Sequence, residues 1–132
     1  MEQVRIIIAG SRDFTDYEIL KKSVFGIFKN RNISKNSVEI ISGTARGADK
    51  LGEEYANEFG LRLKRFPADW SLGKRAGYLR NAEMAAYASG ATGILIAFWD
   101  GESKGTKHMI DLAQARGLEM HVFDFSGKEC KL

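Results

Sequence analysis

Short apolar runs alternate with longer amphipathic stretches along the chain, and this alternation limits the folds that the chain can adopt. The short runs are rich in β-branched residues, which is typical of strands. They cover residues 4–9, 38–41, 61–66, 93–99 and 120–125. Strands that alternate with helices form a parallel sheet that carries helices on both faces.

The amphipathic stretches repeat apolar residues at helical spacing. The first follows Thr15-Asp16-Tyr17-Glu18, which has the pattern of a capping box with Thr15 as the N-cap. The other three helices are predicted at residues 48–59, 75–88 and 106–116. For the helix at 75–88, the expected inward side is formed by Ala76, Leu79, Ala82 and Ala86.

The two most apolar strands, at residues 4–9 and 93–99, are expected to lie at the centre of the sheet. Numbered along the chain, the strands then take the order 3-2-1-4-5. The predicted fold is a Rossmann-like three-layer α/β/α domain with a five-stranded parallel sheet, and a flavodoxin-like order is the alternative. The length of 132 residues is that of a single domain, and residues 126–132 are expected to be a frayed tail.

Composition argues against several classes of protein. One cysteine cannot form an internal disulfide, and two histidines give no zinc-binding pattern, so we expect no metal and no cofactor. The chain has no apolar run of about 18 residues and no signal-peptide pattern. We therefore expect a cytoplasmic protein without a membrane partner.

The 20 basic and 17 acidic residues leave a net charge of +3, which is too small to indicate nucleic-acid binding by itself. The excess is uneven, because six basic residues and one acidic residue lie between Arg62 and Arg80. This segment is either a solvated face or a site for an anion, such as a phosphate or a nucleic-acid backbone.

Polar residues gather in the loops that follow the predicted strands, at residues 10–14, 42–49, 69–74 and 99–106. In open α/β sheets, ligands bind beyond the carboxyl ends of the strands. The loops at 42–49 and 99–106 combine glycines and small hydroxyl side chains with a cation, Arg46 or Lys104, just before a helix. This pattern suits an anion at a helix N-terminus, and its alternative is an ordinary strand-to-helix turn.

Other residue patterns limit the functions that these loops can have. Neither loop has a Walker A sequence, and no Gly-x-Gly-x-x-Gly follows the first strand, which argues against a P-loop NTPase and an ordinary dinucleotide dehydrogenase. Trp70 and Trp99 lie in such loops, where they either stack on a base or cover the core. Glu83, in the same helix as Arg80, is a candidate general base or an ordinary exposed side chain.

Several of these motifs resemble those of known families. The Ser-Gly-x-Ala-x-Gly-x-Asp signature of the DNA-processing DprA/Smf family resembles residues 42–49, and its Gly-Ser-Arg element resembles Gly10-Ser11-Arg12. The Pro-Gly-Gly-x-Gly-Thr loop of the Lonely Guy phosphoribohydrolases is similar to residues 99–106. Both families belong to the SLOG superfamily. Through these motifs and residues 76–84, essentially the whole chain is most similar to the short, stand-alone YspA-type SLOG group.

This resemblance implies a nucleotide or nucleotide-derived, phosphorylated ligand across the carboxyl ends of the strands. The expected ligand-binding residues are Gly10, Ser11, Arg12, Ser42, Gly43, Thr44, Arg46, Gly47, Asp49, Arg80, Asn81, Trp99, Gly101, Ser103, Lys104, Gly105 and Thr106. The phosphoribohydrolases carry Gly-Thr-x-x-Glu, whose glutamate takes part in N-glycosidic cleavage, but Met109 stands at that position here. Glu83 and Asp100 are the candidate catalytic acids, without a matching motif.

Three functions are open on this basis. The chain could bind a nucleotide as a sensor or sequestering domain, cleave an N-glycosidic bond in a nucleotide or NAD-like substrate, or bind single-stranded DNA as DprA does. Because SLOG relatives often associate, the chain could also form a homo-oligomer. The side of the helix that carries Tyr78, Met84 and Tyr87 is then either its interface or part of the core.

Overall fold

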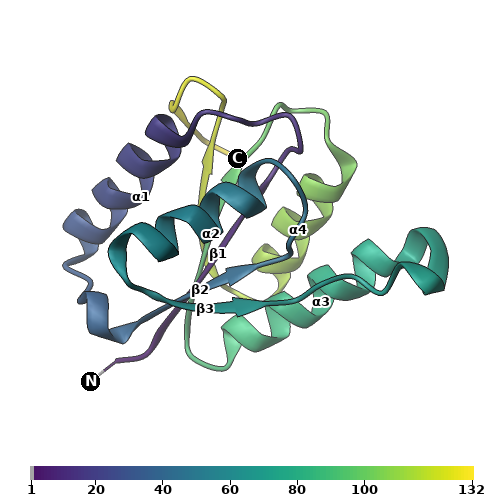
Figure 1. Ribbon diagram of the computed structural model, residues 1–132, viewed down its shortest axis with the longest axis horizontal. Coiled ribbons are helices and arrows are strands. Elements are labelled where there is room, and N and C mark those ends of the chain that lie inside the picture. Colours follow the sequence, from purple (N-terminus) through teal and green to yellow (C-terminus); the bar gives the residue numbers. More distant parts are fainter. Residues whose placement is uncertain (1) are drawn as a thin grey trace.

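Six strands form a sheet in the order β3-β2-β1-β4-β5-β6 in this computed structural model, which describes residues 2–132 (Figure 1). The strands are β1 (Val4–Gly10), β2 (Val38–Ser42), β3 (Arg62–Arg65), β4 (Thr92–Phe98), β5 (Glu119–Phe123) and β6 (Glu129–Cys130). The helices within these residues are α1 (Tyr17–Arg31), α2 (Ala48–Phe59), α3 (Ala76–Ser89) and α4 (Lys104–Ala115), with short 3-10 helices η1 (Lys35–Ser37) and η2 (Trp70–Arg75). The predicted Rossmann-like order 3-2-1-4-5 is confirmed, and a sixth strand is added at one edge.

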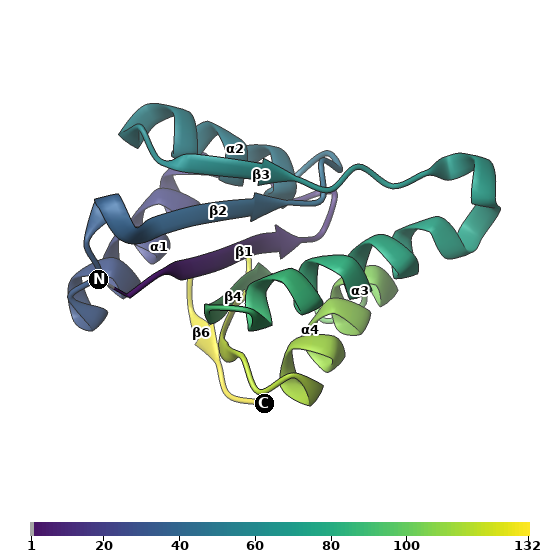
Figure 2. The ribbon, with the colours of Figure 1, turned by 90° about the horizontal axis from the view of Figure 1, so that it is seen from below.

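The four helices lie in two layers, one on each face of the sheet (Figure 2). Helices α1 and α2 pack over one face with Ile6 and Ile8 of β1, and α3 and α4 pack over the other with Ile7 and Ala9. Because both faces of a central strand are covered, its fully buried residues are apolar, and in β1 these include Ile6, Ile7 and Ile8. This explains why β1 and β4 are so apolar. None of the helices in residues 2–132 is long and apolar enough to span a membrane.

The order of the strands creates a switch point at the centre of the sheet. β1 pairs in parallel with β2 on one side and with β4 on the other. The chain leaves β1 and β2 toward the layer of α1 and α2, whereas it leaves β3 and β4 toward the layer of α3 and α4 (Figures 1 and 2). Between β1 and β4 the loops therefore separate, which leaves a crevice at the carboxyl edge of the sheet.

Helix α1 begins one residue later than the capping-box pattern predicts. Its N-cap is Asp16, whose Oδ1 accepts a hydrogen bond from the Ile19 amide at 3.1 Å. A carboxylate satisfies a free amide and also interacts favourably with the positive end of the helix, which gives it an advantage over the Thr15 hydroxyl. The prediction of Thr15 as the N-cap is therefore wrong.

Helix α3 buries a different side from the one that the sequence predicts. Its buried apolar residues are Ala76, Met84, Ala85 and Ala88. Three of the four residues that were predicted to face inward are exposed, namely Leu79, Ala82 and Ala86. The helix carries apolar residues on both sides, so helical spacing alone cannot identify the buried one. On the buried side, Tyr87 is half-buried beneath the guanidinium of Arg5, whose Cζ lies 3.9 Å from the ring centroid.

The segment 126–132 is not simply a frayed tail, as the sequence suggested, because it contains β6. This strand pairs antiparallel with β5. A tight turn produces the pairing: Oδ1 of Asp124 accepts hydrogen bonds from the amides of Ser126 and Lys128 at 2.9 and 3.0 Å. Glu129 on β6 also lies 2.9 Å from Nδ1 of His121 on β5. The segment lacks an apolar pattern, so only its turn residues could have indicated the hairpin.

The Phe14 ring, just after the first polar loop, is a core residue. It is 1% exposed and stacks on Phe98 with ring centroids 4.6 Å apart and an interplanar angle of 11°. We expect Phe14→Ala to lower the free energy of unfolding by about 3–5 kcal/mol, because it leaves a cavity. Urea unfolding measures this change. As a matched control, Phe25→Ala removes a ring that is 58% exposed and should cost less than about 1 kcal/mol. Equal costs at the two positions would contradict this placement of Phe14.

Candidate functional site

A cleft of about 490 Å³ opens at the switch point between β1 and β4. Its walls come from the loops after β1, β2 and β4, from one side of α3 and from the first two turns of α4. The lining residues are Ala9, Gly10, Ser11, Arg12, Asp13, Ala45, Arg46, Asp49, Arg80, Asn81, Met84, Asp100, Glu102, Ser103, Gly105, Thr106 and Met109. A second hollow of about 200 Å³ adjoins it and shares Arg12, Ala45, Arg46 and Arg80 with it.

The loop after β1 is fixed against the end of β4. A Cβ at Gly10 would overlap with the carbonyl of Phe98, so only glycine fits there. The next residue, Ser11, donates its amide to the Phe98 carbonyl at 2.9 Å. Its hydroxyl accepts a hydrogen bond from the Asp100 amide at 3.3 Å. The loops on the two sides of the switch point are thereby joined through one buried serine.

The loop after β2 also packs against the loop after β1. Gly47 has a φ of +83°, and a Cβ there would lie 2.5 Å from the Ser11 carbonyl oxygen and 2.6 Å from that of Arg12. The Ala48 amide, at the start of α2, donates to the Ser11 carbonyl at 3.4 Å. Gly47 thus serves close packing of two loops and does not itself line the cleft.

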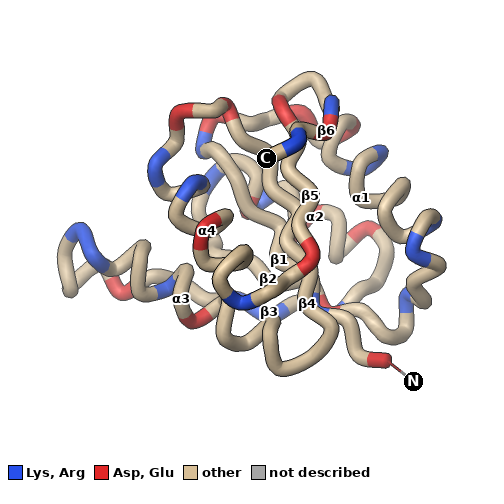
Figure 3. The backbone as a smooth tube through the Cα atoms, turned by 180° about the vertical axis from the view of Figure 1, so that it is seen from behind, with Lys and Arg blue, Asp and Glu red and all other residues tan. Residues whose placement is uncertain are grey.

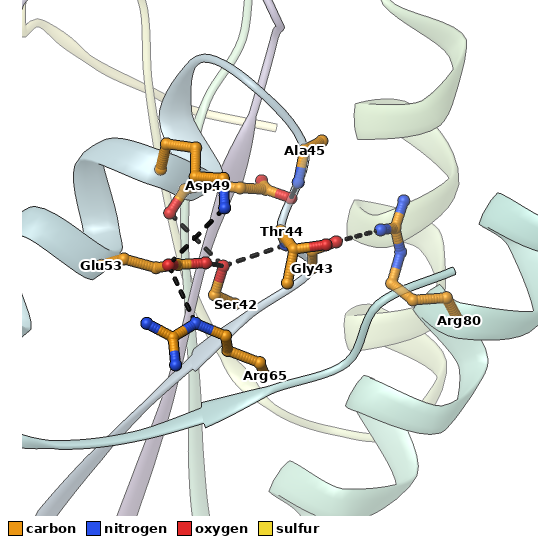
Figure 4. Close-up of polar contacts among 9 residues, drawn as sticks. Ser42, Gly43, Thr44, Ala45, Asp49, Glu53, Arg65 and Arg80 are labelled. Atoms are coloured by element: carbon orange, nitrogen blue, oxygen red, sulfur yellow. Dashed lines mark hydrogen bonds and ion pairs between the residues drawn. The ribbon is translucent and has the colours of Figure 1, made fainter. Parts of the chain in front are cut away.

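Ser42 holds the loop after β2 from inside (Figure 4). Its hydroxyl accepts a hydrogen bond from the Thr44 amide at 3.0 Å and lies 2.7 Å from a carboxylate oxygen of Glu53, to which it donates. The same carboxylate accepts a hydrogen bond from Nε of Arg65 at 3.0 Å. The buried Glu53 is therefore paired, and Ser42 supports the loop instead of facing a ligand.

Asp49 of α2 and Arg80 of α3 meet at Gly43 (Figure 4). A Cβ on Gly43 would lie 2.8 Å from Oδ2 of Asp49 and 2.9 Å from Nη1 of Arg80. Arg80 donates to the Gly43 carbonyl, and Asp49 accepts a hydrogen bond from the Ala45 amide at 3.1 Å. Burial raises the pKa of Asp49 to about 6, although the Ala45 amide and the charge of Arg80 oppose this shift.

Asn81 connects Arg80 to helix α4. It is 6% exposed, and its Oδ1 accepts a hydrogen bond from Nε of Arg80 at 3.0 Å. Its Nδ2 lies 3.4 Å from the Gly105 carbonyl oxygen and 3.3 Å from Nδ1 of His108. Burial lowers the pKa of His108, which favours the neutral ring with an Nδ1 that accepts. One amide side chain thus fixes the guanidinium and the first turn of α4 together.

The loop before α4 is organised by Asp100. Its Oδ1 accepts hydrogen bonds from the amides of Glu102 and Ser103, both at 2.8 Å. These bonds lower the pKa of Asp100, so the carboxylate is ionised at neutral pH. Ser103 is the N-cap of α4, and its hydroxyl lies 3.0 Å from that of Thr106. The N-terminal ends of α2 and α4 both border the cleft, α2 through Asp49 and α4 through Ser103, Gly105 and Thr106.

The structure brings most of the predicted ligand-binding residues together. In the cleft lie Gly10, Ser11, Arg12, Arg46, Asp49, Arg80, Asn81, Ser103, Gly105 and Thr106, and the candidate acid Asp100 is with them. In the second hollow lie Gly43 and Thr44. The remaining predicted residues line neither the cleft nor the second hollow: Ser42, Gly47, Trp99, Gly101, Lys104 and the candidate acid Glu83. Trp99, Gly101 and Lys104 line a separate surface groove along α4, and Glu83 is exposed on α3.

Some residues that line the cleft were not predicted from the sequence. Residues that were not among the expected ligand contacts are Ala9, Asp13, Ala45, Met84, Glu102 and Met109. For Met109 a signal existed, because it stands four residues after Gly105 on α4 and therefore on the same side of the helix. Asp13, Ala45 and Glu102 lie in loops whose turns the local residue pattern does not indicate, and Ala9 and Met84 are apolar residues of β1 and α3.

The basic segment between Arg62 and Arg80 does not form one site. Arg65 is paired with Glu53, and Arg62 donates to the side chain of Gln3 at 2.8 Å. Arg80 alone among its six cations lines the cleft. The cleft itself contains three arginines and four acidic side chains, and Arg46 lies 3.6 Å from Asp13. Affinity for an anion would therefore depend on placed groups and not on a large positive field.

Comparison with known proteins identifies the family of this chain and solved structures that have a similar fold. The sequence model of the family described as "YspA, cpYpsA-related SLOG family" matches residues 4–73, which is just over half of the chain. No curated protein sequence matches the chain.

Two solved structures of DNA processing protein A (DprA) have a similar fold. The protein from Streptococcus pneumoniae is 17% identical with a TM-score of 0.66, over 93% of this chain and 50% of that one. The protein from Helicobacter pylori is 19% identical with a TM-score of 0.63, over 92% of this chain and 66% of that one. This chain thus spans half of the Streptococcus pneumoniae protein and 66% of the Helicobacter pylori protein.

The raised pKa of Asp49 predicts a specific dependence of stability on pH. Between about pH 4, where an unfolded aspartate titrates, and about pH 6, the folded protein holds a proton that the unfolded chain has lost. Stability due to this group is therefore greatest below pH 4 and is lost as the pH rises to 6. Compared with Asp49→Asn, the wild type should lose up to about 3 kcal/mol between pH 4 and 7 in urea unfolding. A difference that does not change with pH would contradict this prediction.

Proposed function

The chain belongs to the YspA, cpYpsA-related SLOG family, and from that premise we propose that it binds a nucleotide or a nucleotide-derived phosphorylated ligand in the cleft. The observation that carries this proposal is the convergence of two helix N-termini and three arginines on one hollow at the switch point. Helix N-termini offer unpaired amides and a positive dipole end, and arginine binds phosphate oxygens through two parallel hydrogen bonds. The volume of about 490 Å³ is that of a small-molecule site.

The placement of groups suggests how such a ligand would lie. Phosphates would occupy the space between the start of α4, at Ser103 and Thr106, and the guanidinium of Arg12. The second hollow would take the sugar or the base, because Trp70 lines it and is 57% exposed. An indole with a free face can stack on a base. Trp99 is less suited to this role, because its Nε1 donates to the Ser103 carbonyl at 3.1 Å and its ring packs against the core.

The lining of the cleft supports binding over cleavage. Met109 lies in the cleft at the position where the resemblance to the phosphoribohydrolases would put a glutamate. A thioether can neither transfer a proton nor stabilise a developing positive charge on a sugar. The nearby Asp100 is engaged by two backbone amides, Asp49 accepts the Ala45 amide, and Glu83 is outside the cleft. We therefore propose a sensor or sequestering role, in which the ligand is released unchanged.

A thermal-shift screen against mono-, di-, tri- and cyclic nucleotides, NAD and ADP-ribose tests this proposal. A ligand at a hundred times its Kd should stabilise the fold by about 2.7 kcal/mol, which raises the Tm by several degrees. Each ligand is then recovered and analysed by chromatography. We expect each ligand to be recovered intact. Release of a free base would show that the chain cleaves the N-glycosidic bond and would contradict a role limited to binding. The absence of a shift with every ligand would contradict the proposal.

Matched variants locate the site. Arg46 is exposed and pairs loosely with an exposed Asp13, so Arg46→Ala should leave the Tm of the free protein unchanged. It should weaken binding about tenfold or more in a calorimetric titration, because it removes one of the three guanidinium groups that line the cleft. Arg116→Ala, just after the opposite end of α4, removes the same charge far from the cleft and should not change the affinity.

Single-stranded DNA is a second candidate ligand. The structure of DprA from Helicobacter pylori concerns the single-stranded DNA binding mode of that protein, and this chain has its fold. Contact with a nucleic-acid backbone releases counterions, so the logarithm of the affinity should fall linearly with the logarithm of the salt concentration. Fluorescence anisotropy with a labelled oligonucleotide measures this slope. A shallow slope, together with a Tm shift by a mononucleotide, would favour the small ligand.

A further inference from the structure

Helix α3 leaves an apolar face uncovered. The exposed side chains on this face recur at helical spacing from the N-cap onward: Arg75 at the N-cap, then Leu79, Ala82, Glu83 and Ala86. Leu79 is 45% exposed at the centre of the face. An amphipathic helix on the surface of a protein normally presents polar residues to water, whereas α3 presents a leucine and two alanines there. The opposite side of the helix already packs on the sheet, so this face lacks a partner within residues 2–132.

The same part of the molecule projects from the body. Figures 1 and 2 show η2 and the first half of α3 extending beyond the sheet and the other helices. No residue of η2 is buried. Of the six large apolar side chains exposed in residues 2–132, four lie on this projection, namely Trp70, Leu72, Tyr78 and Leu79. Apolar residues gathered in this way indicate a surface that contacts another molecule.

The charges on this face indicate that its partner is a second copy of the chain. Arg75 and Glu83 each lie four residues from Leu79, one before it and one after it. Neither forms an ion pair within residues 2–132, and Figure 3 shows both signs of charge along this part of the chain. If two copies of α3 pack antiparallel with Leu79 on Leu79, Arg75 of each copy faces Glu83 of the other. The face is therefore complementary to itself, as a two-fold interface requires.

We propose that two copies of the chain form a dimer by antiparallel packing of their α3 helices about a two-fold axis at Leu79. Ala82 and Ala86 let the helix backbones approach closely, and the leucines fill the centre. Two Arg75–Glu83 ion pairs fix the register and the antiparallel direction. Leu72, at the projecting end, enlarges the apolar area. This interface does not use the cleft, so it does not depend on the identity of the bound ligand.

Charge reversal tests the register directly. Arg75→Glu places two pairs of facing carboxylates in the interface, and Glu83→Arg places two pairs of facing guanidinium groups there. Each single variant should raise the dimer Kd by about tenfold or more in sedimentation velocity experiments, because like charges repel. The double variant Arg75→Glu/Glu83→Arg restores opposite charges across the axis and should return the Kd toward the wild-type value. Glu54→Arg, on the exposed side of α2, is the matched control and should leave the Kd unchanged.

Several outcomes would overturn the proposal. A wild-type protein that remains monomeric at a concentration of about 100 μM has no such interface, since specific dimers bind more tightly. A dimer that is unaffected by either reversal uses another surface. A double variant as weak as the single variants would exclude the antiparallel register. Circular dichroism of each variant should give the wild-type Tm, because the substituted residues are exposed.

A cross-link offers a second measurement of the same geometry. A two-fold axis at Leu79 brings residue 79 of one copy next to residue 79 of the other. In a background with Cys130→Ser, which removes the native thiol, Leu79→Cys should oxidise to a disulfide-linked dimer. Glu54→Cys in the same background should remain monomeric on a non-reducing gel. Equal cross-linking at both positions would reflect random collision and would contradict the proposed axis.

Discussion

The contact of Asp49 and Arg80 with Gly43 is the constraint on which the geometry of the cleft depends. Asp49 comes from α2 on one face of the sheet, and Arg80 comes from α3 on the other. They approach each other only because position 43 has no side chain. Through Asn81, the same guanidinium is also tied to the first turn of α4. The two helical layers are thereby joined at the mouth of the cleft.

Much of the fold follows from apolar patterning, and the exceptions have identifiable causes. A strand covered on both faces is apolar over its buried part, so the central places of β1 and β4 could be predicted from their continuous apolar runs. The buried side of α3 could not, because both of its sides are apolar and the choice depends on the layer that it packs against. The hairpin at β6 depends on one carboxylate, that of Asp124, which accepts two backbone amides.

The loops of the cleft were predictable as a group, but the role of each residue was not. Ser42 and Gly47 belong to the signature, yet they support and pack the loop, which requires knowledge of what lies behind it. Lys104 and Trp99 lie outside the cleft because Asp100 turns the chain before α4. That turn had a signal in the sequence, since an aspartate commonly accepts the amides two and three residues later.

The short strand β6 has a consequence for how copies of this chain can meet. Unpaired strand edges are templates for aggregation, and long parallel sheets are exposed to this hazard. Here one edge is covered by β6, and the other is β3, four residues long and with three cationic side chains. Neither edge offers a long, neutral strand to a neighbour. The apolar sheet is thus protected from uncontrolled polymerisation, and specific association is left to the surfaces of the helices.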